Sequence, residues 1–325
     1  MLSTRNPTDM RGYWCENSRV VLSDSLAPPE PAGGDLLLRT VLALAEPADE
    51  RPLGFRGVPG SNFVARVEDA PAPHREWIGR RVAVSPMVTC GACDFCRGGA
   101  AGVCESREVM GLEGRAGGLA TLVSAPVRNV VELPDRLADE HAVFAWSVAK
   151  AARISAAARV GRSHFVSVLG DRPLALLVAQ LLTRHCERVR VLGHGVWSAS
   201  ECERLGIRFR PLGDVGRRRD QHVVVDCSSG ALAGVGVHLL RPRGTLVLAS
   251  SPTPAAIDLA LLASREGSAI GVAGGNIVEG VSLLAAGALD VSGMIGSRED
   301  CPKVLAASVT PATLVQFAQA ALPSR

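Results

Sequence analysis

Lysine is almost absent from this chain. Only Lys150 and Lys303 are lysines among its 35 basic residues, and the formal net charge of the 325 residues is +3. So small a charge gives no electrostatic signature of nucleic-acid binding or of attachment to an anionic membrane surface, and we expect neither partner. The predominance of arginine, beside abundant Ala, Gly and Val, indicates codon bias rather than a phosphate-binding design.

Long apolar runs, repeats and low-complexity tracts are also missing. The longest clean apolar stretch, residues 173–182, is too short to span a bilayer. The opening segment MLSTRNPTDM has no apolar core of a secretory signal and is expected to be a short disordered lead before Arg11. We therefore expect a cytoplasmic protein, and its length and 47% hydrophobic content suit two domains.

The cysteines are distributed unevenly. The chain has nine of them, four within a span of fifteen residues, and the other five are scattered: Cys15, Cys186, Cys202, Cys227 and Cys301. An odd total with one tight cluster argues against a disulfide framework. It favours a metal site in a reducing compartment.

The tight cluster has the spacing of a zinc site. It runs Cys90-Gly-Ala-Cys93-Asp-Phe-Cys96, followed after seven residues by Cys104. Thiolates at this spacing can turn toward one tetrahedral centre, and four of them leave no open coordination position. The pattern predicts one structural zinc that does no chemistry, with free thiols or an iron–sulfur cluster as the alternatives.

Up to about residue 147 the pattern is that of a β-rich, barrel-like domain. Short β segments are separated by turns rich in Gly and Pro. The expected strands are VVLSD (20–24), DLLLRTVLALA (35–45), NFVARV (62–67), RRVAVSPMV (80–88) and ATLVSAPV (120–127).

From about residue 148 short apolar runs alternate with helical stretches. The runs are 165–170, 188–193, 222–227, 244–250 and 268–274, and helices are expected over 173–185, 199–205 and 231–240. This alternation predicts a parallel sheet covered on both faces. The tail after about Leu289 is short and mixed, and we expect it to return to the first domain.

With these features in view, the chain resembles the zinc-containing, alcohol dehydrogenase-like branch of the medium-chain dehydrogenase/reductase superfamily. Besides the cysteine cluster, the matching segments are GRRVAV (79–84), GRAGGLATLVSAP (114–126), ELPD (132–135), VLGDRPLALLVAQ (168–180) and LRPRGTLVLAS (240–250). The resemblance implies an α/β protein with a GroES-like domain over 1–147, completed by about 289–325. It also implies a Rossmann domain with a doubly wound parallel sheet over 148–288, a cleft for a small-molecule ligand between the domains, and a homo-oligomer.

The chain departs from this family where a catalytic zinc would be bound. Relatives carry a Cys after the strand matched by LLLRTVLA, where this chain has Ala-Glu-Pro-Ala-Asp (45–49). The family's Gly-His-Glu corresponds to Gly60-Ser61-Asn62, and its third ligand position to Trp146-Ser147. Neutral hydroxyl and amide oxygens do not sustain a protein zinc site. We therefore predict that the catalytic zinc is lost, that Trp146 fills the vacated space, and that no catalytic residue can be assigned.

The dinucleotide fingerprint is degenerate. In place of Gly-x-Gly-x-x-Gly the chain reads Gly-Asp-Arg-Pro-Leu-Ala over 170–175. Gly170 is retained, and Asp171 adds negative charge beside a site meant for an anion. Arg172 stands where the pyrophosphate approaches the bare backbone, so it either pairs with the phosphates or fills their space.

The acidic residue that usually binds the adenine ribose is missing from the end of the second strand. The chain has Gly193-His194-Gly195 there. His194 could contact a 2′-phosphate, which would favour NADP(H), or it could simply be solvated. The remaining polar candidates have structural explanations: Glu46 and Asp49 in a turn, His141 at the surface, Cys227 as a buried thiol, and Arg217–Arg219 in a solvated loop.

Two functions follow from this pattern. The first is a catalytically degenerate scaffold or binding protein that keeps the dehydrogenase fold and its structural zinc. The second is a zinc-independent NADP(H)-dependent reductase of a carbonyl or an activated alkene, in which the cofactor carries the chemistry. The simultaneous damage to the zinc ligands and to the cofactor glycines favours the first, and cofactor binding separates the two.

Overall fold

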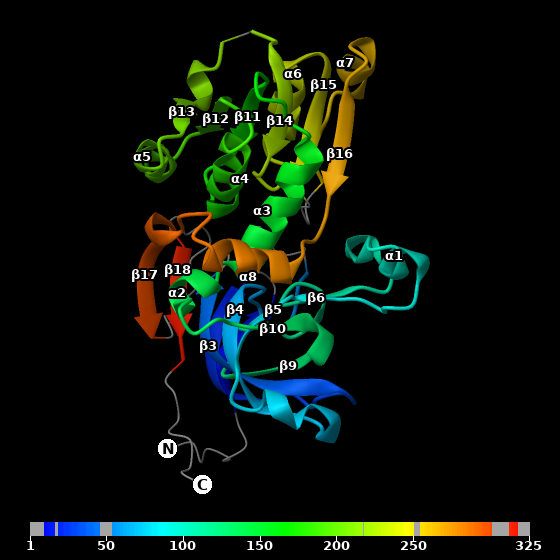
Figure 1. Ribbon diagram of the computed structural model, residues 1–325, viewed down its shortest axis with the longest axis vertical. Helices are drawn as coiled ribbons and strands as arrows, with labels where there is room; N and C mark the ends of the chain where they lie inside the picture. Colours follow the sequence, from blue (N-terminus) through cyan, green and yellow to red (C-terminus); the bar gives the residue numbers. More distant parts are fainter. Residues whose placement is uncertain are drawn as a thin grey trace. The chain divides into compact units, whose positions relative to one another are not determined.

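The computed structural model describes residues 10–16, 19–45, 54–216, 218–249, 254–300 and 312–317, with only the backbone for 297–300. The chain forms two compact units (Figure 1). Unit 1 is made of Met1–Trp146 and Ile295–Arg325, and unit 2 of Ser147–Met294. No helix in the described ranges is long and apolar enough to cross a membrane.

Unit 1 is built on a mainly antiparallel sheet. Its strand order is β10-β5-β4-β3-β18-β17, and β9 also pairs with β3. The strands are β3 (Asp35–Ala45), β4 (Phe63–Asp69), β5 (Arg81–Val84), β9 (Leu122–Pro126), β10 (Val130–Glu132), β17 (Ile295–Asp300) and β18 (Ala312–Gln316). β18, near the end of the chain, pairs antiparallel with β3, near its beginning. The two ends of the chain therefore contribute to one sheet.

Smaller elements surround this sheet. β1 (Met10–Glu16) and β2 (Arg19–Leu26) pair as an antiparallel ribbon, and β6 (Met87–Val88), β7 (Glu108–Met110) and β8 (Gly114–Arg115) form a three-stranded sheet. Two short helices, α1 (Asp94–Arg97) and α2 (Asp139–Ala142), lie in the connections. The lead expected before Arg11 falls on residues 1–9, outside the described residues, whereas β1 begins at Met10.

The core of unit 1 depends on a close approach of two backbones. Gly118 N–H donates to the Gly60 carbonyl at 2.8 Å, and Gly117 N–H donates to the Val58 carbonyl at 2.8 Å. A Cβ on Gly118 would overlap the ring of Phe63, which is 2% exposed in the core. Only glycine lets these segments meet at this distance.

Unit 2 contains a six-stranded parallel sheet in the order β13-β12-β11-β14-β15-β16. The strands are β11 (Phe165–Leu169), β12 (Arg188–Gly193), β13 (Arg208–Pro211), β14 (Gln221–Asp226), β15 (Leu240–Ala249) and β16 (Ser268–Val272). Numbered within the sheet this is the order 3-2-1-4-5-6 of a Rossmann fold. The predicted α/β class, with a β-rich domain and a doubly wound parallel sheet, is confirmed.

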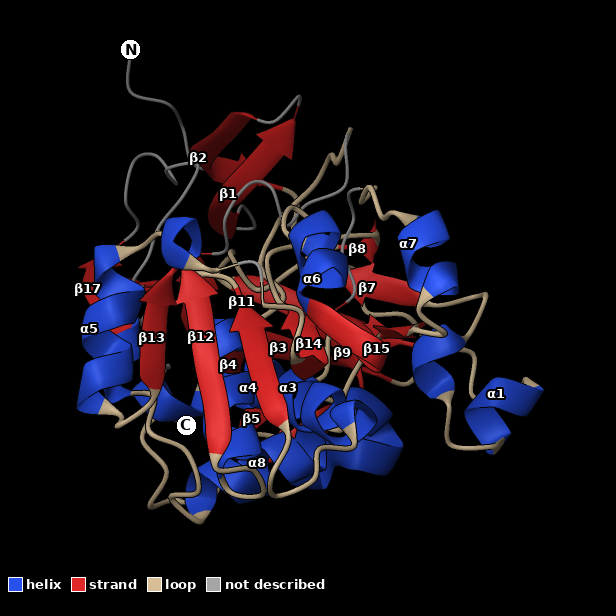
Figure 2. Cartoon of the chain, turned by 90° about the horizontal axis from the view of Figure 1, so that it is seen from above, coloured by secondary structure: helices blue, strands red, loops and turns tan. Residues whose placement is uncertain are grey.

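Helices cover this sheet in two groups. They are α3 (Ala145–Ala158), α4 (Pro173–Thr183), α5 (Val196–Arg204), α6 (Ala233–Leu239), α7 (Leu259–Ser264) and α8 (Ile277–Ala285). α4 packs on β11 and β12, α5 on β12 and β13, and α6 on β14 and β15, as Figure 2 shows from above. From β11 the chain continues outward to β12 and β13 on one side of the sheet, and then from β14 to β15 and β16 on the other side. Because the crossovers are right-handed, α4 and α5 lie on one face of the sheet and α6 and α7 on the other.

We predict that Gly118→Ala lowers the free energy of unfolding by about 1–3 kcal/mol, because the added methyl group overpacks the core against Phe63. Gly33→Ala is the matched control, since a Cβ there meets no atom within 4 Å. Its effect should stay within about 0.5 kcal/mol. Urea unfolding of both variants measures the difference, and equal stabilities would contradict the close approach.

Candidate functional site

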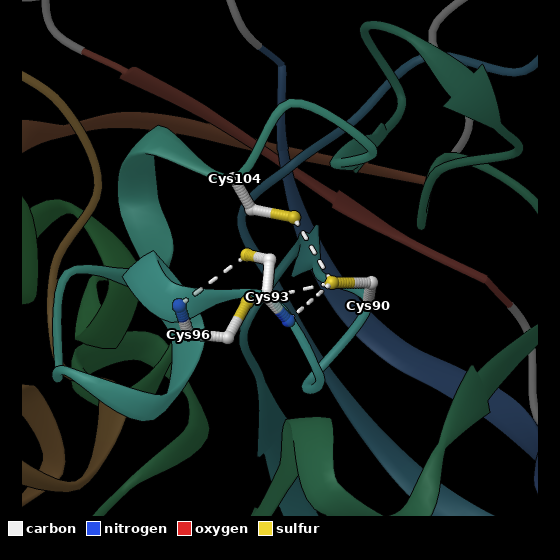
Figure 3. Close-up of side chains that lie close together, drawn as sticks. All are labelled: Cys90, Cys93, Cys96 and Cys104. Atoms are coloured by element: carbon white, nitrogen blue, oxygen red, sulfur yellow. Dashed lines mark hydrogen bonds between the residues drawn. The ribbon is translucent and has the colours of Figure 1, made fainter.

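The four clustered cysteines converge on one point. Their sulfur atoms all lie within 4.8 Å of one another, with Cys90 Sγ 3.9 Å from Cys96 Sγ and 3.6 Å from Cys104 Sγ. Figure 3 shows the sulfur atoms of all four side chains facing a common centre. Since a disulfide requires about 2.05 Å between sulfurs, these are four free thiols.

The local backbone explains why the thiols meet. Gly91 has φ +72°, a left-handed conformation that turns the chain between Cys90 and Cys93. Cys93 is the N-cap of α1, and its sulfur accepts the N–H of Cys96 at 3.4 Å. Cys90 Sγ accepts two further N–H groups, from Ala92 at 3.4 Å and Cys93 at 3.3 Å.

These N–H groups favour the thiolate form. The N–H donors of Ala92 and then Cys93 lower the pKa of Cys90 to about 6. A thiolate is the form that binds a metal.

The spacing of the sulfur atoms fits zinc. A tetrahedral zinc with four thiolate ligands at about 2.3 Å places its sulfurs about 3.8 Å apart, close to the separations seen here. Four ligands fill the coordination shell, so a metal here would cross-link and stabilise the 90–104 lobe. It would have no open coordination position for a substrate. Within the described ranges, no other group of three or more His, Cys, Asp and Glu side chains could hold a metal.

The described residues at the expected positions of a catalytic zinc, 60–62 and 146–147, do not form a group of metal ligands. Ser61 and Asn62 are 2% and 3% exposed, and Asn62 Nδ2 donates to Ser61 Oγ at 3.4 Å. Trp146 is buried, at 4% exposure. The position of the expected cysteine, 46–49 with Glu46 and Asp49, lies outside the described residues, and Ala45 ends β3.

The first nucleotide-binding turn keeps the backbone of the Rossmann fold. Gly170 follows β11 with φ +131°, and a Cβ there would lie 3.1 Å from the Cys227 carbonyl, so this position needs glycine. α4 begins at Pro173, and Arg172 is its N-cap without a side-chain hydrogen bond to the helix. The helix start therefore presents Arg172 at the place of the fingerprint's second glycine, followed by Pro173.

Asp171 does not project freely from this turn. Its carboxylate accepts the N–H of His194 at 2.8 Å (Oδ2) and 3.0 Å (Oδ1), and the N–H of Gly195 at 2.8 Å. Ser198 Oγ donates to the same carboxylate at 2.6 Å. Asp171 thus binds the start of α5, where the helix dipole favours an anion.

The charge of Asp171 is stabilised by these contacts. Burial alone raises the pKa of this carboxyl, but the hydrogen bonds from Ser198, His194 and Gly195 outweigh that effect and hold it below its usual value. Asp171 is therefore ionised at neutral pH. The predicted site residue His194 contributes its main-chain N–H, while its ring is exposed to solvent.

One polar residue at this edge of the sheet was missed from the sequence. Asp226, the last residue of β14, is 1% exposed, and its Oδ1 accepts Ser228 N–H at 2.9 Å. Burial raises the pKa of its carboxyl, and its Oδ2 is buried without a hydrogen-bond partner. The sequence feature that could have indicated this residue is the aspartate at the end of the apolar run HVVVD (222–226). The neighbouring Cys227 is buried, as expected for a structural thiol.

Comparison with known proteins gives partial matches in sequence. Residues 33–135 match the alcohol dehydrogenase GroES-like domain. The starvation-sensing protein RspB of Escherichia coli K12 is 32% identical over 105 residues, which cover 32% of this chain and 31% of RspB. An L-threonine 3-dehydrogenase of Chelativorans sp. BNC1 is 36% identical over 88 residues, covering 27% and 25%. The chain thus matches a third or less of the length of these two relatives.

Solved structures extend the likeness in fold to nearly the whole chain. RspB of E. coli CFT073, a short chain alcohol dehydrogenase in complex with NADH, has a TM-score of 0.81 at 19% identity and covers 95% of this chain and 100% of its own. A Sinorhizobium meliloti 1021 protein described as a zinc-binding dehydrogenase, bound to NADP, has a TM-score of 0.80 at 23% identity, covering 94% and 99%.

Residues 33–135 thus match the alcohol dehydrogenase GroES-like domain, and nearly the whole chain shares the fold of these dehydrogenases. Both findings agree with the predicted family. As a dehydrogenase-like protein the chain has a four-cysteine cluster that fits a structural zinc. The turn after β11 carries a charged contact from Asp171 to the start of α5.

We predict one zinc per chain, counted by elemental analysis of the purified protein. Cys90→Ser and Cys104→Ser should each reduce the count to about zero and lower the melting temperature, because the lobe loses its metal. Cys186→Ser is the control, since this buried thiol donates to the His164 carbonyl in unit 2 and should keep one zinc. Full zinc occupancy in the Cys90 and Cys104 variants would contradict the assignment.

Proposed function

We propose that this dehydrogenase-like protein binds structural zinc through Cys90, Cys93, Cys96 and Cys104 but performs no zinc-dependent hydride transfer, and acts as a binding or scaffold protein. The observation that carries this proposal is the Asp171 carboxylate, which takes up the hydrogen-bond donors at the start of α5. Fold does not fix function, so the argument rests on this site.

The place occupied by Asp171 is the one a cofactor needs. In Rossmann proteins the end of the second strand and the start of the following helix receive the adenine ribose, with its 2′-phosphate in NADP. Here that strand is β12, and Asp171 accepts the N–H groups directly after it. Since a carboxylate repels a phosphate and has already taken these donors, NADP(H) is disfavoured.

The pyrophosphate position is altered in the same turn. The fingerprint requires a bare backbone at the place where Arg172 stands, and Pro173 removes one N–H from the first turn of α4. Ser61, Asn62 and Ser147, at the positions expected for catalytic zinc ligands, offer only neutral oxygen donors. The proposal accounts for these changes as a common loss of the cofactor and the catalytic metal.

A second candidate function has an observation in its favour. The complete six-stranded Rossmann sheet and the glycine at Gly170 are kept, and relatives of this fold are bound to NADH and NADP. A zinc-independent reductase on this scaffold would prefer NADH, because Asp171 provides a carboxylate near the ribose position and excludes a 2′-phosphate. This preference differs from the NADP(H) expected from His194.

The test is a calorimetric titration of NADH, and separately of NADPH, into the zinc-loaded protein. The scaffold proposal predicts no binding of either cofactor up to millimolar concentration. Micromolar binding of NADH alone would support the reductase instead, and micromolar binding of NADPH would contradict both.

The variant Asp171→Ala tests directly whether this carboxylate prevents NADPH from binding. Removing the carboxylate frees the two N–H groups and the Ser198 hydroxyl, so NADPH affinity should rise by about tenfold or more, the value of one charge-assisted hydrogen bond. Glu203→Ala is the matched control, because it removes the same charge from an exposed position on α5, the helix that Asp171 contacts. Equal NADPH binding by the two variants would show that Asp171 does not block the site.

A further inference from the structure

We propose that unit 2 has a ligand site separate from the nucleotide turn, a groove that binds a small anion carrying at least two phosphate groups. The groove has a volume of about 530 Å³ and is lined by five arginines, Arg188, Arg190, Arg208, Arg210 and Arg218. Among the described residues of the lining, two are carboxylates, Asp214 and Asp220, which leaves an excess of three positive charges.

The groove begins at the opposite end of the sheet from the nucleotide turn and extends along β12 and β13. Its lining includes Phe165, the first residue of β11, and Gln221, the first residue of β14. Gly170 and Asp226, in contrast, mark the carboxyl ends of the same strands. Ligands of Rossmann folds bind at the carboxyl ends, so this groove is not the cofactor site.

Two neighbouring strands set the arginines in a regular array. Arg188 and Arg190 are two residues apart on β12, and Arg208 and Arg210 are two residues apart on β13, with Arg190 directly opposite Arg208. Residues two apart share a face of the sheet. The four guanidinium groups therefore lie on one face, and the segment between β13 and β14 adds Arg218.

Arg190 is fixed by a chain of hydrogen bonds. Its Nε donates to Ser167 Oγ at 2.9 Å, and Ser167, which is fully buried, donates to Gln221 Oε1 at 2.7 Å. Gln221 Nε2 in turn donates to Asp220 Oδ1 at 2.6 Å. This arrangement holds the Arg190 side chain in the groove lining before a ligand arrives, which lowers the cost of binding.

In the part of the chain that the structure describes, the two carboxylates of the lining balance only part of the positive charge of the groove. Among the described residues, none of the five arginines has a carboxylate oxygen within 4 Å. Burial, opposed by Asp220 and assisted by the nearby charge of Arg210, lowers the pKa of Arg190. Like charges placed this close repel one another, and a bound anion would relieve that repulsion.

The shape and charge select the class of ligand. Guanidinium groups bind phosphate oxygens in pairs, and five of them suit more than one phosphate group. A concave groove of this volume is typical of small-molecule sites. The chain's net charge of +3 is not the strongly basic balance typical of nucleic-acid-binding proteins.

Calorimetric titration with inorganic tripolyphosphate tests the proposal. The zinc-loaded wild type should bind it with micromolar affinity that weakens as salt rises. Arg208→Gln combined with Arg210→Gln should lower the affinity by about 100-fold, since two charge-assisted contacts are lost. Both side chains are exposed and make no ion pair in the described structure, so this variant should fold.

Two controls locate the binding. Arg75→Gln with Arg136→Gln removes the same charge from exposed positions of unit 1 and should leave the affinity unchanged. Arg172→Ala should also leave it unchanged, because that residue lies in the nucleotide turn. Loss of binding only in Arg172→Ala, no binding by the wild type, equal binding of citrate, or tighter binding of a single-stranded oligonucleotide would each overturn the proposal.

Discussion

The contact between Asp171 and the start of α5 decides what the nucleotide edge of this protein can do. It joins the connection after β11 to the connection after β12 through a carboxylate, two main-chain N–H groups and the Ser198 hydroxyl. In a cofactor-binding Rossmann domain such donors face a ligand. Here they are satisfied by the Asp171 carboxylate, which stabilises the helix start. On our proposal this contact disfavours an anionic ligand.

The two ends of the parallel sheet have consequently opposite electrostatic character. At the carboxyl ends the protein provides its own anion, Asp171, and a buried carboxyl, Asp226. From the amino ends of β11, β12 and β14 along one face of β12 and β13, five arginines and two carboxylates of the described residues line a groove. We propose that this fold, which normally binds phosphate at the carboxyl ends of its strands, disfavours phosphate there and binds it in the arginine-lined groove. The zinc cluster is independent of both, because it belongs to unit 1.

Sequence reasoning succeeded where a local pattern determines the structure. The cysteine spacing gave the four-thiol cluster, and apolar runs such as 222–227 located strands of the parallel sheet. β13 was missed because Arg208-Phe-Arg-Pro211 has only one apolar residue, so its strand pairing comes from tertiary contacts with β12. Asp171 was expected to add charge beside an anion site, but its partners lie 23 to 27 residues away and no local pattern indicates them. Arg218 was interpreted as part of a solvated turn, because the groove becomes visible only when three segments are brought together.

The most direct test of this account is the amide NMR spectrum of isotope-labelled, zinc-loaded protein during addition of NADPH. The signals of His194 and Gly195 report on the two N–H groups that bind Asp171. If the carboxylate occupies these donors, neither signal should shift at millimolar NADPH. A saturable shift of both signals at micromolar NADPH would show that the cofactor displaces Asp171, and would contradict the central claim.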